Sequence, residues 1–118
     1  GQLRNAYALA SIVVSRAGAG AIFEIAAWGK PAILVPLRNA AQNHQRKNAY
    51  EYAAGDTTVV IEEQNLTPHI LLAEIKKLTA DPERMKKMGE QAQKFSRLDS
   101  AEIVAREILK LGLHGKEL

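Results

Sequence analysis

The chain has 118 residues, of which 47% are hydrophobic and 25% charged, with a formal net charge of +3 and no cysteine. This length allows one domain or part of one, and the absence of cysteine excludes disulfide scaffolds, cysteine nucleophiles and thiolate metal sites. No apolar run approaches the roughly 20 residues that span a bilayer, and no signal peptide precedes the first apolar segments. A first residue Gly1 in place of Met is typical of a fragment.

The predicted elements of the first half alternate between short apolar runs and amphipathic runs. In chain order they are a short helix at 3–10, a strand at 11–14, a helix at 19–28, a strand at 32–36 and a helix at 40–54. Gly29 and Pro31 end the second of these helices, and Gly55 ends the third. The strands are rich in β-branched residues, as buried strands are.

The second half opens with a strand and continues as helices. The strand is predicted at 57–61. Thr67 followed by Pro68 predicts a capped helix to about Leu78, and the same signal at Asp81 and Pro82 predicts a helix to about Phe95. A cap at Asp99 or Ser100 predicts a last helix that ends near Gly112, so the C-terminal helices occupy 67–112.

The order of elements predicts an α/β fold. Short buried strands that alternate with helices favour a parallel sheet with right-handed crossovers. Three strands make a small sheet with long exposed edges, and such edges are usually paired or covered. We therefore expect residues 1–118 to be a single partial domain, the later part of a larger one, with an edge that invites a homodimer.

The segment from Ser15 to Glu24 joins the first strand to the second helix through a turn of small residues. Backbone N–H groups at a helix start are unpaired, and the helix dipole adds partial positive charge there. Gly18 and Gly20 let an anionic ligand approach the backbone closely. The segment therefore predicts a phosphate or diphosphate site, with Glu24 one turn further as an acceptor for hydroxyl groups.

Several spaced motifs together resemble the C-terminal domain of the MurG family, the bacterial N-acetylglucosaminyltransferases of peptidoglycan synthesis. The motifs are Ser15-Arg16-Ala17-Gly18-Ala19, Glu24, the segment 29–36, His44-Gln45, Asn48-Ala49 and Gly55. The resemblance is strongest from Val13 to Gly55 and is shared more loosely by other nucleotide-sugar glycosyltransferases. It implies a Rossmann-like parallel sheet flanked by helices, the later part of the C-terminal domain of a two-Rossmann-domain glycosyltransferase.

The activity that the resemblance implies belongs to the intact enzyme. That enzyme is an inverting hexosyltransferase, which moves N-acetylglucosamine from UDP-N-acetylglucosamine to the muramoyl C4 hydroxyl of lipid I and so gives lipid II. The family's C-terminal domain binds the donor, and its N-terminal domain binds lipid I and holds the presumed catalytic base. We therefore expect this chain to hold no catalytic residue, to be inactive alone and to need no cofactor. The implied location is the cytoplasmic face of the bacterial inner membrane, as a peripheral protein.

The resemblance also assigns roles to individual residues. It places the UDP diphosphate against the turn Gly18-Ala19-Gly20-Ala21, the ribose hydroxyls at Glu24 and the sugar at His44, Gln45 and Asn48. It places Leu3 near the uracil and gives supporting roles to Ser15 and Arg16.

Several of these assignments have alternatives. The family commonly has Thr where this chain has Ala21, so the backbone alone would contact the phosphates. Arg16 suits a salt bridge at the sheet edge as well as a phosphate, and Asn48 suits a structural role as well as a ligand contact. His44 fits an exposed helix position.

Two other functions stay open. The chain could be a non-catalytic interaction or regulatory module of the same fold, or the donor subunit of another UDP-sugar lipid glycosyltransferase. The basic residues are interspersed with acidic ones from Glu74 to Arg106, which indicates a solvated surface and no nucleic-acid partner. The spacing of His, Asp and Glu does not suggest a metal site.

Overall fold

The computed structural model describes residues 11–38 and 43–117. The elements follow in the order β1 (Val13–Ser15), α2 (Ala19–Trp28), β2 (Ala32–Leu34), α3 (Asn43–Ala53), β3 (Thr58–Val60), the 3-10 turn η2 (Glu63–Asn65), α4 (Pro68–Thr79) and α5 (Pro82–Glu117). The strands form one sheet in the order β1-β2-β3, and both pairs are parallel. The predicted α/β class is therefore confirmed. The helix predicted at 3–10 lies outside the described residues.

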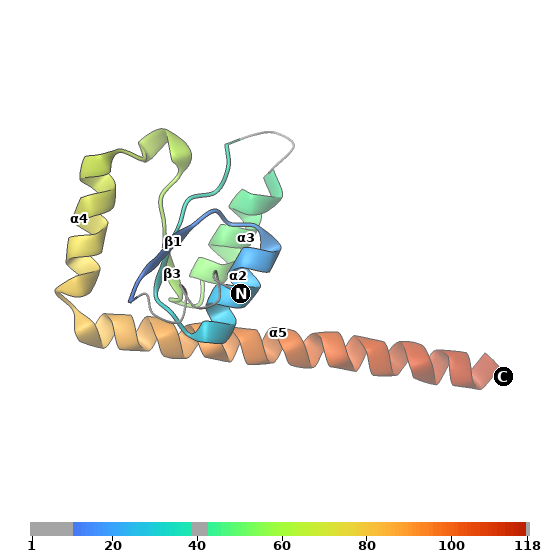
Figure 1. The fold of residues 1–118 in the computed structure, drawn as a ribbon. Coiled ribbons are helices and arrows are strands. Elements are labelled where there is room, and N and C mark those ends of the chain that lie inside the picture. The colour runs from blue at the N-terminus through green and yellow to red at the C-terminus, as the bar shows by residue number, and fades with distance from the viewer. Residues whose placement is uncertain (1–10, 39–42, 118) are drawn as a thin grey trace, which may run out of the picture.

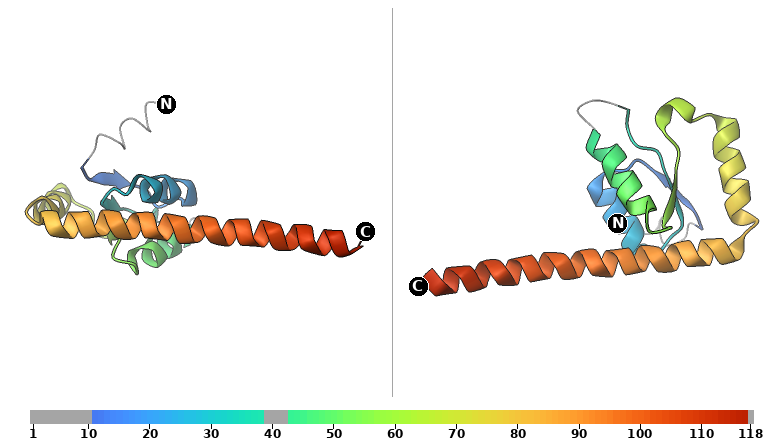
Figure 2. Two further views of the ribbon diagram at one scale, coloured as in Figure 1. Left: turned by 90° about the horizontal axis from the view of Figure 1, so that it is seen from below. Right: turned by 180° about the vertical axis from the view of Figure 1, so that it is seen from behind.

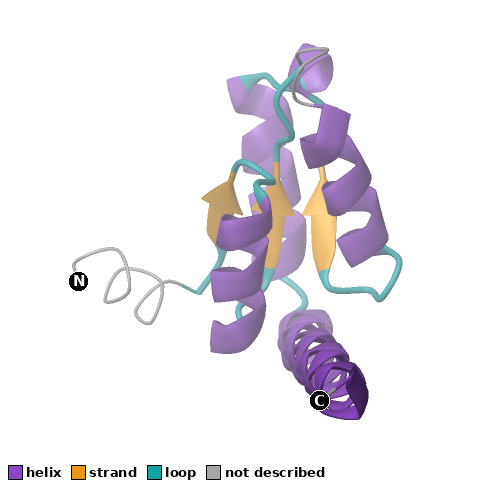
Figure 3. Cartoon of the chain, turned by 90° about the vertical axis from the view of Figure 1, so that its right-hand side faces the viewer, coloured by secondary structure: helices purple, strands orange, loops and turns teal. Residues whose placement is uncertain are grey.

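The sheet is covered on both faces. Helices α2 and α3 lie on one face and α4 lies on the other, while α5 runs beneath the end where the strands begin (Figures 1 and 3). The second half of α5 extends beyond the sheet, and all its described side chains from 101 to 110 are exposed (Figure 2). This arrangement leaves the carboxyl ends of the strands free of α5.

The central strand β2 shows why both faces must be covered. Ala32 and Leu34 belong to the core beneath α2 and α3, whereas Ile33 belongs to the core beneath α4, and all three are fully buried. Successive side chains of a strand point to opposite faces, so an unbroken apolar run buries both. The continuous apolar sequence of this strand therefore indicates its central position.

One prediction in the second half is wrong. The sequence predicts a helix to about Phe95 and another from Asp99 or Ser100, but α5 continues without a break from Pro82 to Glu117. Asp and Ser favour caps, yet an exposed helix interior tolerates them at small cost when no Gly or Pro is adjacent. The signals at Thr67 and Asp81 do act as caps, since they accept from the N–H groups of Ile70 and Arg84, each at 3.1 Å.

Two glycines set how α5 packs on α2. Gly29 ends α2 in the left-handed conformation (φ 66°), and its N–H donates to the Ala26 carbonyl at 3.0 Å. Gly89 of α5 lies so close to the Gly29 carbonyl that a Cβ atom on Gly89 would overlap the oxygen. A Cβ on Gly29 would in turn lie 2.7 Å from atoms of Gln93. The close approach of the two helices therefore requires glycine at position 89, and the left-handed conformation favours glycine at position 29.

Tyr52 anchors α3 in the core. Its ring is fully buried and meets the Phe95 ring of α5 edge-on, with centroids 4.9 Å apart. The main-chain carbonyl of Tyr52 accepts a bond from the Thr57 hydroxyl at 2.6 Å. The phenol oxygen has no hydrogen-bond partner among the described residues. Tyr52 therefore contributes mainly through the packing of its buried ring.

This burial predicts a pH dependence of stability. Burial raises the pKa of the Tyr52 phenol to about 12 from its ordinary value of 10. The unfolded chain loses this proton first, so the group leaves the free energy of unfolding unchanged below pH 10 and lowers it as the pH rises from 10 to about 12. A pKa difference of about 2 corresponds to at most about 3 kcal/mol. Urea unfolding measured between pH 10 and about 12 should show a larger loss of unfolding free energy in the wild-type chain than in Tyr52→Phe. Equal losses of unfolding free energy in both would contradict the prediction.

Candidate functional site

The candidate site lies at the carboxyl ends of the strands, where open parallel sheets bind ligands. Gly18 precedes α2 in an extended conformation and offers no side-chain cap. The first bond of α2 runs from the Ile22 N–H to the Gly18 carbonyl at 3.0 Å. The N–H groups of Ala19, Gly20 and Ala21 thus have no helical acceptor. They form a group of free donors at the positive end of the helix dipole.

The space beside this turn is open. Cβ atoms built on Gly18 and on Gly20 would meet no atom within 4 Å. Glu24 is exposed, and neither an ion pair nor a hydrogen bond engages its carboxylate among the described residues. It lies four residues after Gly20 and so on the same side of α2, one turn further along. The turn and Glu24 can therefore hold an anionic group and a hydroxyl group at the same time.

Gln45 of α3 connects two loops of the site. Its side-chain oxygen accepts from the Leu37 N–H at 3.1 Å and from the Ala17 N–H at 3.4 Å. These donors fix the orientation of the amide, whose nitrogen remains available for a ligand oxygen. Gln45 therefore has a structural role, because its oxygen connects the residue before Gly18 with the loop after β2.

The two other predicted sugar-binding residues also lie on α3. His44 is exposed at the start of α3. Asn48 lines a crevice of about 190 Å³ between α2, α3 and α5, together with Ala19, Ile22, Phe23, Glu51, Phe95 and Asp99. The predicted uracil neighbour Leu3 lies outside the described residues.

Ser15 and Arg16 make their contacts within the protein. The Ser15 hydroxyl donates to the Arg16 carbonyl at 2.8 Å. The Arg16 guanidinium pairs with Glu63 at 3.1 Å and donates to the Val35 carbonyl at 3.4 Å. The salt bridge that the sequence analysis kept as an alternative for Arg16 is therefore present.

Sequence reasoning missed an acidic pair at the end of β3. Glu62 accepts from Arg46 at 2.6 Å, and Glu63 accepts from the Arg38 N–H at 2.9 Å. The Arg38 N–H first, and the Arg16 guanidinium second, hold the pKa of Glu63 below its ordinary value. Arg46 also lies over the Tyr50 ring, 5.7 Å from its centre. The position directly after a strand was the one signal that could have singled out these carboxylates.

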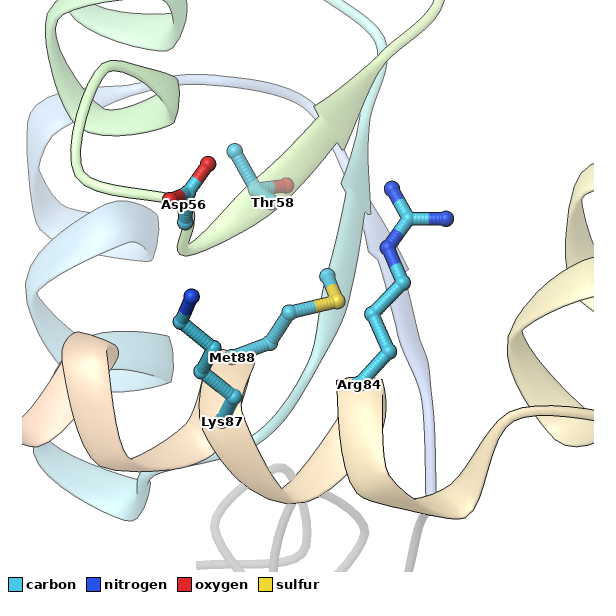
Figure 4. A pocket seen from close by; sticks show the side chains of 5 residues that line it. All are labelled: Asp56, Thr58, Arg84, Lys87 and Met88. Atoms are coloured by element: carbon cyan, nitrogen blue, oxygen red, sulfur yellow. The ribbon is translucent and has the colours of Figure 1, made fainter.

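A second hollow lies at the opposite end of the sheet, between the start of β3 and α5 (Figure 4). It is lined by Asp56, Thr58, Arg84, Lys87 and Met88. This hollow lies where β3 begins, whereas parallel sheets bind ligands at the carboxyl ends of their strands, so it is separate from the candidate site.

Nowhere in 11–38 and 43–117 do three or more His, Asp or Glu gather in a metal-binding group. Over the same residues, none of the helices has the length and apolarity needed to cross a membrane.

Comparison with known proteins adds to this geometry. The profile of the family described as glycosyltransferase family 28 C-terminal domain matches residues 2–104. The chain is 43% identical over 107 residues to the UDP-N-acetylglucosamine–N-acetylmuramyl-(pentapeptide) pyrophosphoryl-undecaprenol N-acetylglucosamine transferase of Geobacter metallireducens, covering 91% of this chain and 29% of that protein. The protein of the same name from Rhodopseudomonas palustris strain BisA53 is 43% identical over 100 residues, which cover 85% of this chain and 27% of the relative.

A solved structure shows the same arrangement. The crystal structure of Acinetobacter baumannii MurG superposes with a TM-score of 0.68 at 29% identity, over 76% of this chain and 26% of that one. The chain thus spans less than a third of the length of these relatives.

Proposed function

The chain belongs to the glycosyltransferase family 28 C-terminal domains, and from this premise we propose that it is the donor-binding part of a UDP-N-acetylglucosamine-dependent transferase that converts lipid I to lipid II. The observation that carries the proposal is the uncapped start of α2, with open space beside Gly18 and Gly20. Free N–H donors at a helix start suit the diphosphate of a nucleotide sugar. The names of the matched relatives support the choice of sugar and acceptor.

Each proposed residue has a task in this donor site. The N–H groups of Ala19, Gly20 and Ala21 would bind the diphosphate, and the Glu24 carboxylate would accept from the ribose hydroxyls. The Gln45 amide nitrogen would donate to a sugar hydroxyl, with His44 and Asn48 as further candidates at the sugar. None of these steps requires a metal ion.

In the chemical step, the start of α2 would stabilise the charge on the leaving diphosphate. The acceptor hydroxyl attacks the anomeric carbon from the face opposite UDP, so the C–O bond to the diphosphate breaks as the new glycosidic bond forms. Negative charge then develops on the leaving diphosphate. Donors already directed at that charge stabilise the transition state more than the ground state. We propose that the N-terminal domain of the complete enzyme supplies the base and the lipid I site at the cytoplasmic face of the inner membrane.

Glu24→Ala tests the donor site directly. Two charge-assisted hydrogen bonds to ribose would be lost, so we expect the Kd for UDP and for UDP-N-acetylglucosamine to rise about 10- to 100-fold. The measurement is calorimetry or NMR titration of the 118-residue chain. Uridine, which lacks the diphosphate, should bind more weakly than UDP if the start of α2 contributes.

Glu83→Ala is the matched control, because it removes the same charge from an exposed helix position at the far end of the sheet. It should leave the Kd unchanged. Equal affinity of wild type and Glu24→Ala would remove Glu24 from the site. A folded wild-type chain that binds neither nucleotide would favour the interaction-module hypothesis, and binding of a different UDP-sugar would favour another lipid glycosyltransferase.

A further inference from the structure

Two loops form the candidate donor site, and one carboxylate contacts both. The first loop joins β1 to α2 and contains Arg16, and the second leaves β2 and contains Arg38. Glu63, the first residue of η2, places Oε1 3.1 Å from the Arg16 guanidinium and Oε2 2.9 Å from the Arg38 N–H. Each oxygen of a single carboxylate therefore holds a different loop.

Gln45 makes the same connection from the other side. Its oxygen accepts from Ala17 in the first loop and from Leu37 in the second. The residues that Glu63 and Gln45 contact are sequence neighbours, Arg16 and Ala17 in the first loop and Leu37 and Arg38 in the second. Arg16 makes a third connection between the loops, because its guanidinium donates to the Val35 carbonyl at 3.4 Å. The loops are thus fastened together directly before the turn that begins α2.

We propose that Glu63 is a positioning residue of the donor site, which holds the turn from Gly18 to Ala21 and the segment from Val35 to Arg38 in one fixed relation. This inference rests on the proposed function, because it takes the start of α2 as the diphosphate site. The contacts of Glu63 with Arg16 and Arg38 form a clamp between the two loops. Arg16 is thereby assigned to this clamp and not to direct binding of phosphate.

A positioning role and a phosphate-binding role for Arg16 predict opposite results. If Arg16 were a phosphate ligand restrained by Glu63, then Glu63→Gln would release its charge and strengthen the binding of UDP. If Glu63 positions the loops, Glu63→Gln should weaken binding about three- to tenfold, because a neutral amide holds the guanidinium less tightly. Glu63→Ala, which removes both acceptors, should weaken binding further.

Stability separates positioning from a general structural role. The Arg16 and Glu63 side chains are 47% and 36% exposed, and ion pairs this accessible contribute little to folding. The thermal midpoint should therefore change no more than in Glu74→Gln, which removes the same charge from a partly exposed pair with Lys77 on α4. Glu74→Gln should also leave the Kd for UDP unchanged.

The amide NMR spectrum of the chain without ligand provides a readout that does not depend on nucleotide binding. Glu63→Ala should shift the signals of Ala17, Gly18 and Leu37, and Glu74→Gln should not. Unchanged signals in Glu63→Ala, or an unchanged or tighter Kd in Glu63→Gln, would overturn the inference. Shifted signals in a chain whose wild type binds no UDP would retain the clamp and reject the proposed donor site.

Discussion

Gly89→Ala is expected to lower the free energy of unfolding by about 1–3 kcal/mol, although alanine is the better helix former by roughly 1 kcal/mol. The reason is the overlap between the new Cβ atom and the Gly29 carbonyl oxygen. Both partners belong to the main chain, so no side chain can rotate to relieve the overlap. Gly29 is itself fixed by its left-handed conformation and its bond to Ala26. Helix α5 must therefore move away from α2, with loss of the contacts around it.

Gly20→Ala is the matched control. Gly20 also lies in a helix, but its Cβ atom would meet nothing within 4 Å. Alanine there should raise the free energy of unfolding by up to about 1 kcal/mol through helix propensity alone. Urea unfolding of both variants gives the comparison. Equal stabilisation of the two variants would show that α5 does not pack against the end of α2 in solution.

Tyr52→Ala should have the largest effect on stability, a loss of about 3–5 kcal/mol. The ring is fully buried between α3, α5 and the sheet, and its removal leaves a cavity beside Phe95. Tyr52→Phe should instead be neutral or stabilising, because the phenol oxygen has no partner among the described residues.

Thermal or urea unfolding of these two variants separates packing from hydrogen bonding. A loss of several kcal/mol in Tyr52→Phe would mean that the hydroxyl is satisfied in solution. A small loss in Tyr52→Ala would mean that the core collapses around the missing ring, and the contact with Phe95 would then contribute little to holding α5 on the sheet.

The sequence alone determined the class of the fold and the location of the turn. Alternation of buried strands with capped helices predicted the parallel sheet, and each observed strand lies within two residues of its expected bounds. These features are local, because each depends on only a few neighbouring residues. They are the strand patterns, the caps at Thr67 and Asp81 and the glycine that ends α2. The small residues of the turn, Gly18 to Ala21, likewise appear in the sequence itself, and the start of α2 lies where they indicate.

Only the tertiary structure decided how distant segments meet. Helix α5 continues through Asp99 and Ser100. These residues favour a helix cap only weakly, so the local sequence does not decide between a new helix there and one continuous helix. The approach of Gly89 to Gly29 joins residues 60 positions apart. The clamp of Glu63 on Arg16 and Arg38 brings together three loops at the carboxyl end of the sheet. Such contacts follow from the packing of the whole sheet, so no short stretch of sequence contains them.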